Sequence, residues 1–153
     1  MMIDLADEAA TAALAKTVAG VCRPGDVIAL SGDLGSGKTV FARAFINARA
    51  DHPEEVPSPT YTLVQTYDDP KGIAIYHFDL YRIEGADELE ELGMEDAFAD
   101  GISLIEWPDR MGNLLPADRL DLSLAAGAED GQRQATLQGL GSWAARLGGL
   151  NHD

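Results

Sequence analysis

The sequence predicts an α/β fold in which helices sandwich a mainly parallel β-sheet that also carries antiparallel hairpins. Short apolar runs that are typical of buried strands, such as residues 26–31 and 102–105, alternate with stretches of helical periodicity such as residues 7–19. The chain has 153 residues, of which 46% are hydrophobic, and this is enough to bury the core of one compact unit. We therefore expect a single domain that spans residues 1–153.

The first part of the chain predicts a helix, a turn, a strand and a second helix. Residues 7–19 place their apolar side chains three or four positions apart, as one face of a helix requires. Pro24 and Gly25 then favour a turn before the apolar run 26–31. Residues 40–46 return to helical periodicity, so the segment between this strand and this helix is a short loop.

Two antiparallel hairpins are predicted further along the chain. β-Branched and aromatic residues dominate 61–67 and 73–78, and the sequence Asp-Asp-Pro-Lys-Gly at 68–72 has the composition of a turn. Residues 120–124 and 134–138 form a second pair of this kind across a Gly-rich turn.

The remaining segments are short. In residues 84–100 acidic side chains alternate with apolar ones, which predicts one or two amphipathic helices with a solvated charged face, although the same helices would also serve to cover a site. Residues 102–105 form an apolar strand that ends before Pro108, and residues 142–147 predict a closing helix.

The loop between the first strand and the second helix contains a motif that indicates which ligand the protein binds. Residues 32–39 read Gly-Asp-Leu-Gly-Ser-Gly-Lys-Thr, a complete G-x-x-x-x-G-K-[ST] motif, in which backbone N–H groups surround phosphate oxygens, the lysine supplies a charge and the threonine hydroxyl can ligate Mg²⁺. An ordinary glycine-rich turn is the alternative. The motif favours a P-loop NTPase-like sandwich that binds a nucleotide through Asp33, Leu34, Gly35, Ser36, Gly37, Lys38 and Thr39.

Two acidic residues follow apolar strands and are candidate metal ligands. Asp79 comes directly after residues 73–78, and Glu106 comes directly after residues 102–105. Ligands of parallel sheets bind at the carboxyl ends of the strands, so both side chains are expected near the phosphates, where they form a Mg²⁺ site with Thr39. The alternative for each is a solvated loop acid, which is common in so acidic a chain.

Other polar residues near these acids allow two interpretations each. His77 shares a strand face with Asp79 and either orients a metal-bound carboxylate or a water, or is a hydrogen-bonded core histidine. Arg82 reaches phosphate or an acidic side chain, or forms a plain surface ion pair. Thr60, in the sequence Ser-Pro-Thr at 58–60, either senses the γ-phosphate as a switch threonine does or belongs to a rigid turn.

Composition limits the partners and the compartment. Eleven Lys and Arg residues against 26 Asp and Glu residues give a net charge of −15, a field that repels nucleic acid and anionic membranes. This acidity either serves solubility or forms a patch that meets a basic protein partner. Cys22 is the single cysteine, and no long apolar run or leader-like segment is present. We expect a soluble, cytoplasmic protein that binds neither membrane nor DNA directly.

Four linked motifs resemble the bacterial TsaE (YjeE) family. These are the phosphate loop at 32–39, Ser-Pro-Thr-Tyr-Thr-Leu-Val at 58–64, His-Phe-Asp-Leu-Tyr-Arg at 77–82 and Ile-Glu-Trp-Pro at 105–108. The resemblance implies an ATPase, with ATP or ADP and Mg²⁺ as cofactors, that assists the TsaD and TsaB proteins in making N6-threonylcarbamoyladenosine at position 37 of tRNA. The tRNA would be handled by these partners, so this chain would contact it only indirectly.

The same resemblance implies roles for individual residues. Lys38 and Thr39 match the family's phosphate-loop residues, Asp79 and Glu106 its magnesium-associated acids, and Thr60 its switch-like threonine, while Trp107 is the tryptophan after the second acid. By position, Thr11 and Gly131 match residues on the adenosine side. The chain departs from the family in the last hairpin, where Gln132 separates Gly131 from Arg133, a shift that would move the guanidinium relative to the nucleotide.

The expected chemistry is hydrolysis of ATP by an in-line water, slow in the isolated protein and stimulated by partners, with hydrolysis resetting the complex. Glu106, His77 or a residue ordered by the partner would align the water. A small-molecule kinase is the main alternative, although no arginine-rich lid is visible in the sequence, and a nucleotide-gated binding module with negligible turnover is the third. A GTPase is disfavoured because no Asn-Lys-x-Asp motif occurs.

Overall fold

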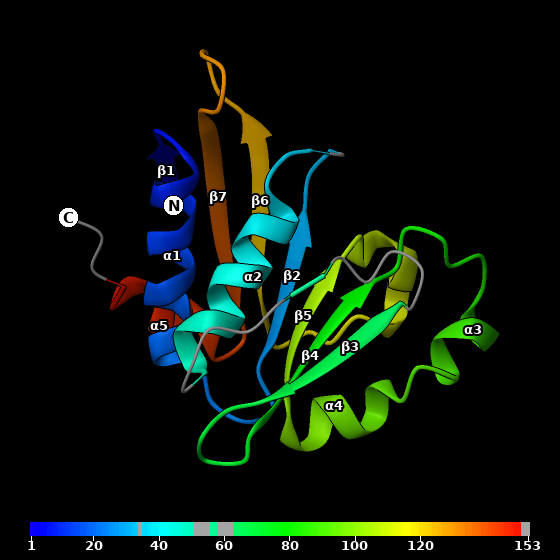
Figure 1. Ribbon diagram of the computed structural model, residues 1–153. Coiled ribbons are helices and arrows are strands. Elements are labelled where there is room, and N and C mark those ends of the chain that lie inside the picture. The colour runs from blue at the N-terminus through cyan, green and yellow to red at the C-terminus, as the bar shows by residue number, and fades with distance from the viewer. Residues whose placement is uncertain (34, 51–55, 58–62, 151–153) are drawn as a thin grey trace.

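A single mixed β-sheet organises the molecule. The computed structural model describes residues 1–33, 35–50, 56–57 and 63–150, and it contains a seven-stranded sheet in the order β1-β7-β6-β2-β5-β4-β3 (Figure 1). The strands are β1 Met2–Leu5, β2 Val27–Ser31, β3 Val64–Asp68, β4 Ala74–Asp79, β5 Ile102–Glu106, β6 Arg119–Ala126 and β7 Arg133–Leu140. The helices are α1 Glu8–Val21, α2 Lys38–Arg49, α3 Ala86–Glu90, α4 Met94–Asp100, the 3₁₀ helix η1 Pro108–Leu114 and α5 Trp143–Gly148.

The centre of the sheet is parallel and its outer strands are antiparallel. Strands β6, β2, β5 and β4 pair in parallel, whereas β3 joins β4, β7 joins β6 and β1 joins β7 in antiparallel register. This arrangement confirms the predicted α/β fold with a parallel centre and two added hairpins. Parallel pairing also brings the carboxyl ends of β2, β4 and β5 to the same edge of the sheet, where ligands of such folds bind.

Two elements were not predicted. Strand β1 lies where no structure was assigned, because its partner β7 is more than 120 residues away and only pairing in the sheet stabilises so short a segment. The amino group of Met1 also donates to the Leu137 carbonyl at 3.0 Å. Helix η1 was overlooked because Pro108 was interpreted only as the end of a strand, whereas proline is well suited to the first position of a helix.

Helices cover both faces of the sheet. Helices α1, α2 and α5 pack on one face, over a core that includes Leu14, Phe41 and Trp143 (Figure 1). On the other face, α3, α4 and η1 cover a smaller core around Phe78 and Ile105. In the part of the chain that the structure describes, no helix is long and apolar enough to cross a membrane.

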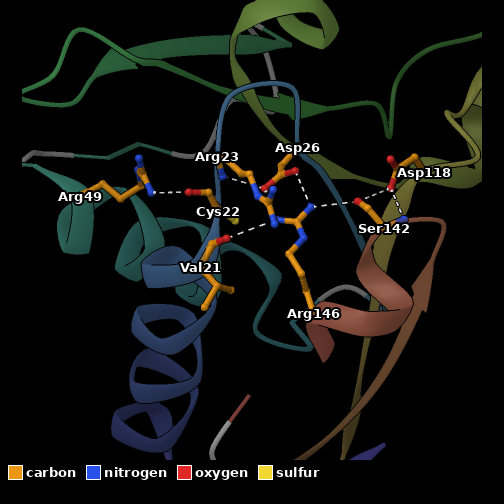
Figure 2. Close-up of polar contacts among 8 residues, drawn as sticks. All are labelled: Val21, Cys22, Arg23, Asp26, Arg49, Asp118, Ser142 and Arg146. Carbon is orange, nitrogen blue, oxygen red and sulfur yellow. Dashed lines mark hydrogen bonds and ion pairs between the residues drawn. The ribbon is translucent and has the colours of Figure 1, made fainter. Parts of the chain in front are cut away.

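An ion pair attaches the C-terminal helix to the end of the sheet opposite the phosphate loop. The guanidinium of Arg146 donates to both carboxylate oxygens of Asp26 at 2.7 Å, and Asp118 accepts from Ser142 beside it (Figure 2). Asp26 immediately precedes β2, so the strand that leads into the phosphate loop is anchored at its start.

Candidate functional site

The phosphate loop is folded around the ammonium group of Lys38. The lysine Nζ donates to the carbonyls of Gly32 at 2.6 Å and Asp33 at 2.9 Å, and it lies 4.2 Å from the ring centroid of Trp107. Burial lowers the pKa of Lys38, and the charges of Glu106 and Asp79 act in the opposite direction. A buried cation with these neighbours is well placed to receive an anionic ligand.

Gly32 is required by the close packing at the base of this loop. Its φ is +143°, and an added Cβ would lie 2.4 Å from the Leu124 carbonyl oxygen and 2.5 Å from Ser36 Oγ. Gly35 also has a positive φ, +79°, but its Cβ would meet nothing within 4 Å. The same substitution therefore has different consequences at the two positions.

We expect Gly32→Ala to lower the free energy of unfolding by about 3 kcal/mol, because steric overlap with backbone adds to the strain of the dihedral angle. Gly35→Ala is the matched control. It introduces only the strain of the positive φ angle, and it should lower the free energy of unfolding by about 1 kcal/mol. Urea unfolding without nucleotide measures both. Equal losses in the two variants would contradict the packing argument.

The register of β4 and β5 sets the two acidic residues side by side. Asp79 is the residue opposite Glu106 in this parallel pair, and both side chains are buried. Alternation along the strands puts them on the face covered by α1 and α2, so they approach the start of α2. Thr39 Oγ1 donates to Glu106 Oε1 at 3.3 Å. These groups are oxygen ligands of the kind that Mg²⁺ prefers.

His77 orients Glu106. Its Nε2 lies 2.5 Å from Glu106 Oε2, and the imidazole is fully buried. A carboxylate only accepts hydrogen bonds, so Nε2 carries the proton in this contact. That His77 orients a carboxylate was one of its two predicted roles, but its partner Glu106 was not predicted, because the contact depends on the pairing of His77 with Leu104 between neighbouring strands. Asp79, for its part, accepts from the Tyr81 backbone N–H at 3.0 Å, which restricts its carboxylate.

A cavity of about 370 Å³ lies in front of these groups. Eight predicted site residues line it, and so does Trp107. It is also lined by Glu8, Val40 and Arg133, which the site prediction did not include. Glu8 precedes Thr11 by one helical turn, so the position of Thr11 was the available signal for it. The predicted residues on the cavity wall are Thr11, Gly35, Gly37, Lys38, Thr39, Asp79 and Gly131 together with Glu106.

Arg133 reaches the phosphate loop although Gln132 precedes it. The guanidinium donates from Nε to the Ser36 carbonyl and from Nη2 to the Gly35 carbonyl, both at 3.0 Å. The shift in the hairpin therefore leaves this side chain at the cavity.

Several predicted residues lie elsewhere. Ser36 is buried, Asp33 contributes its carbonyl to Lys38, and Arg82 is exposed and does not line the cavity. Leu34 and Thr60 lie outside the described residues.

A parallel-centred α/β sheet, a glycine-rich loop that leads into a helix, and a lysine and threonine facing acids on the neighbouring strands define a P-loop NTPase-like protein. The family model "Threonylcarbamoyl adenosine biosynthesis protein TsaE" matches residues 5–135. The chain belongs to the TsaE family.

Individual relatives agree with this assignment. A protein of Rickettsia bellii, named tRNA threonylcarbamoyladenosine biosynthesis protein TsaE, is 39% identical over 120 residues, which cover 78% of this chain and 83% of the relative. A Bacillus subtilis protein of the same name is 38% identical over 133 residues, which cover 86% and 81%. The crystal structure of Bacillus subtilus YdiB superposes with a TM-score of 0.79 at 30% identity and covers 98% of this chain and 93% of that one.

Proposed function

We propose that this chain is a cytoplasmic, Mg²⁺-dependent ATPase that assists the TsaD and TsaB proteins in the biosynthesis of N6-threonylcarbamoyladenosine in tRNA. The observation that carries the proposal is the contact of Thr39 with Glu106, beside Asp79 and in front of the phosphate loop. A loop that only bound phosphate would not need buried carboxylates at this point, whereas hydrolysis needs groups that hold a metal ion. The names of the relatives support the pathway.

ATP and ADP would bind through the loop amides and Lys38. The phosphates would replace the Gly32 and Asp33 carbonyls as partners of the lysine, and the N-terminus of α2 would face them. Thr11 and Gly131 line the same cavity and would contact the nucleoside side. One cavity would then accommodate both parts of the nucleotide.

Thr39, Asp79 and Glu106 would hold Mg²⁺, directly or through water, since a hydroxyl and two carboxylates match the preference of this ion for oxygen. Bound there, the ion would neutralise charge on the β- and γ-phosphates. His77 keeps Glu106 aimed at Thr39, because it restrains the other carboxylate oxygen.

Hydrolysis requires a water in line with the γ-phosphate. Both Glu106 oxygens already have partners, Thr39 and His77, so this carboxylate is a restrained candidate for aligning the water. A residue ordered by the partner would complete the arrangement, and turnover would then be slow in the isolated chain and stimulated in the complex. Hydrolysis would then reset the complex, and equal partner affinity with ADP and with a non-hydrolysable ATP analogue would argue against this cycle.

The test is phosphate release from Mg·ATP by this chain alone and with purified TsaD and TsaB. We expect slow release alone and at least about tenfold stimulation by the pair, because a partner that orders one catalytic contact contributes a few kcal/mol. The stimulation should be absent in Lys38→Ala. Transfer of phosphate to a small-molecule acceptor, without stimulation by the pair, would replace this proposal with the kinase alternative.

A further inference from the structure

A second cavity lies on the face of the sheet opposite α1 and α2. It has a volume of about 640 Å³, compared with about 370 Å³ for the cavity at the phosphate loop, and is formed by α3, α4 and η1. Its floor is apolar and consists of Leu89, Met94, Phe98 and Met111. Leu114, at the end of η1, forms part of the wall and is 54% exposed. We call this cavity the α3–α4 groove.

The charged residues that line the groove are all acidic. Glu90, Glu95 and Asp96 are exposed, and neither lysine nor arginine is among the lining residues of the described chain. The groove therefore combines an apolar floor with a negatively charged rim. Two methionines in the floor add side chains that adapt readily to the shape of a partner.

This chemistry selects among the possible occupants. The acidic rim repels nucleotides and nucleic acid, and among the described residues at the groove no group of three or more acidic, histidine or cysteine side chains is arranged to hold a metal ion. A second copy of this chain would carry the same acidic rim and a net charge of −15. A basic amphipathic helix satisfies both features, because its apolar face fits a hydrophobic groove and its Lys and Arg residues meet the rim.

We propose that the α3–α4 groove binds a basic amphipathic helix of a protein partner. The apolar face of that helix packs on Met94, Met111 and Leu114, and its basic residues pair with Glu90 and Glu95. This inference rests on the proposed function in one respect, since the partner that presents the helix is then the TsaD–TsaB pair.

The position of η1 connects the groove with the nucleotide cavity. Trp107, which directly precedes η1, has its ring over the Lys38 ammonium, and Met111 and Leu114 of η1 line the groove. Arg110, which lies between Trp107 and Met111 in the sequence, has its guanidinium over the Tyr81 ring, and this ring in turn contacts Trp107. One short helix thus contributes to both sites, and a partner bound in the groove rests on the segment that follows Trp107.

The four methionines of the chain provide a direct test. Met94 and Met111 lie in the groove, and Met1 and Met2 lie at the opposite edge of the sheet, on or next to β1. With ¹³C-methyl-methionine labelling, addition of the TsaD–TsaB pair should shift or broaden the Met94 and Met111 signals and leave those of Met1 and Met2 unchanged. The same labelled protein is titrated with an 18-residue amphipathic Leu/Lys peptide as an independent probe.

Two pairs of variants identify the chemistry. Leu114→Asp should weaken binding of the TsaD–TsaB pair about tenfold, since it introduces a charge into an apolar contact, whereas Met2→Asp, at another exposed apolar side chain, should not. Glu90→Lys/Glu95→Lys should slow association and reduce its salt dependence, and Asp4→Lys/Asp68→Lys, with equal charge change on exposed residues elsewhere, should not. Thermal unfolding checks that each variant is folded.

The outcomes separate this inference from the proposed function. One outcome is that the TsaD–TsaB pair binds without shifting the Met94 and Met111 signals, and binds Leu114→Asp with full affinity. This outcome overturns the groove assignment and leaves the ATPase proposal intact. If the TsaD–TsaB pair does not bind the wild-type chain at all, the proposed function fails, and the titration with the Leu/Lys peptide then tests the groove. Peptide-induced shifts confined to the Met94 and Met111 signals support helix binding in the groove, and any other pattern overturns it. Methyl shifts on dilution of the chain alone would assign the groove to a second copy and overturn the proposal.

Discussion

Replacing Lys38 by alanine is expected to reduce ATP hydrolysis by at least about 100-fold, the loss typical of removing one preorganised group that stabilises transition-state charge. Lys38 is the cation at the cavity wall closest to the loop carbonyls, with Nζ 2.6 Å from the Gly32 oxygen. Burial lowers its pKa by disfavouring the charged form, and the negative charge of an incoming triphosphate would favour that form. The lysine therefore gains more from phosphate than an exposed lysine would.

Two measurements check this expectation. Phosphate release gives the loss of turnover, and the rise in unfolding temperature on adding Mg·ATP, which reports binding to the folded state, should be large in the wild-type protein and small in Lys38→Ala. Lys16→Ala is the matched control, because Lys16 is exposed on α1 away from the loop. Normal turnover in Lys38→Ala would show that the loop does not bind the phosphates in the way proposed here.

Local sequence was sufficient to predict the phosphate loop and its setting. The spacing of glycines, lysine and threonine specifies a conformation that depends on few distant residues, and the flanking strand and helix were visible as apolar patterns. Asp79 and Glu106 could be placed at strand ends for the same reason. Their mutual position could not be predicted, because it depends on the β4–β5 register, which brings Asp79 opposite Glu106.

Long-range contacts account for what was missed. Arg133 reaches the Gly35 and Ser36 carbonyls from a hairpin almost 100 residues away, and β1 needs β7 as its partner. The acidic segment 84–100 was correctly interpreted as short amphipathic helices, α3 and α4, but its apolar face gave no indication that η1 would complete a groove with it. In each case the missing information is which segments become neighbours.

The second large effect is expected at the other end of the molecule, where Arg146→Ala should lower the free energy of unfolding by about 3 to 5 kcal/mol. The side chains of Arg146 and Asp26 are only 12% and 9% exposed, and their two hydrogen bonds are both 2.7 Å (Figure 2). The hydrogen bonds to Asp26 raise the pKa of Arg146, so the guanidinium stays protonated throughout the accessible pH range. Removing the guanidinium leaves a buried carboxylate with the Arg23 N–H as a remaining partner.

Arg146→Ala should lower the free energy of unfolding by more than the ion pair alone contributes, because Arg146 makes other contacts as well. Arg146 also donates to the Val21 carbonyl at the end of α1 and lies 3.9 Å from the ring centroid of the fully buried Trp143. The same guanidinium thus holds α5 against the turn between α1 and β2, and packing of Trp143 depends on α5 staying in place. Urea unfolding of Arg146→Ala measures the sum of these contributions.

A double-mutant cycle isolates the charge pair from the packing. Asp26→Asn and Arg146→Met each leave one charge without its oppositely charged partner, whereas the double variant removes both charges and keeps an apolar stem against Trp143. Because the cost of breaking a buried pair is mainly that of the charge left behind, the double variant should be more stable than the sum of the two single losses predicts. Additive losses would mean that Asp26 and Arg146 stabilise the fold independently. Phosphate release should change little in the folded variants, since both residues lie at the end of the sheet away from the phosphate loop.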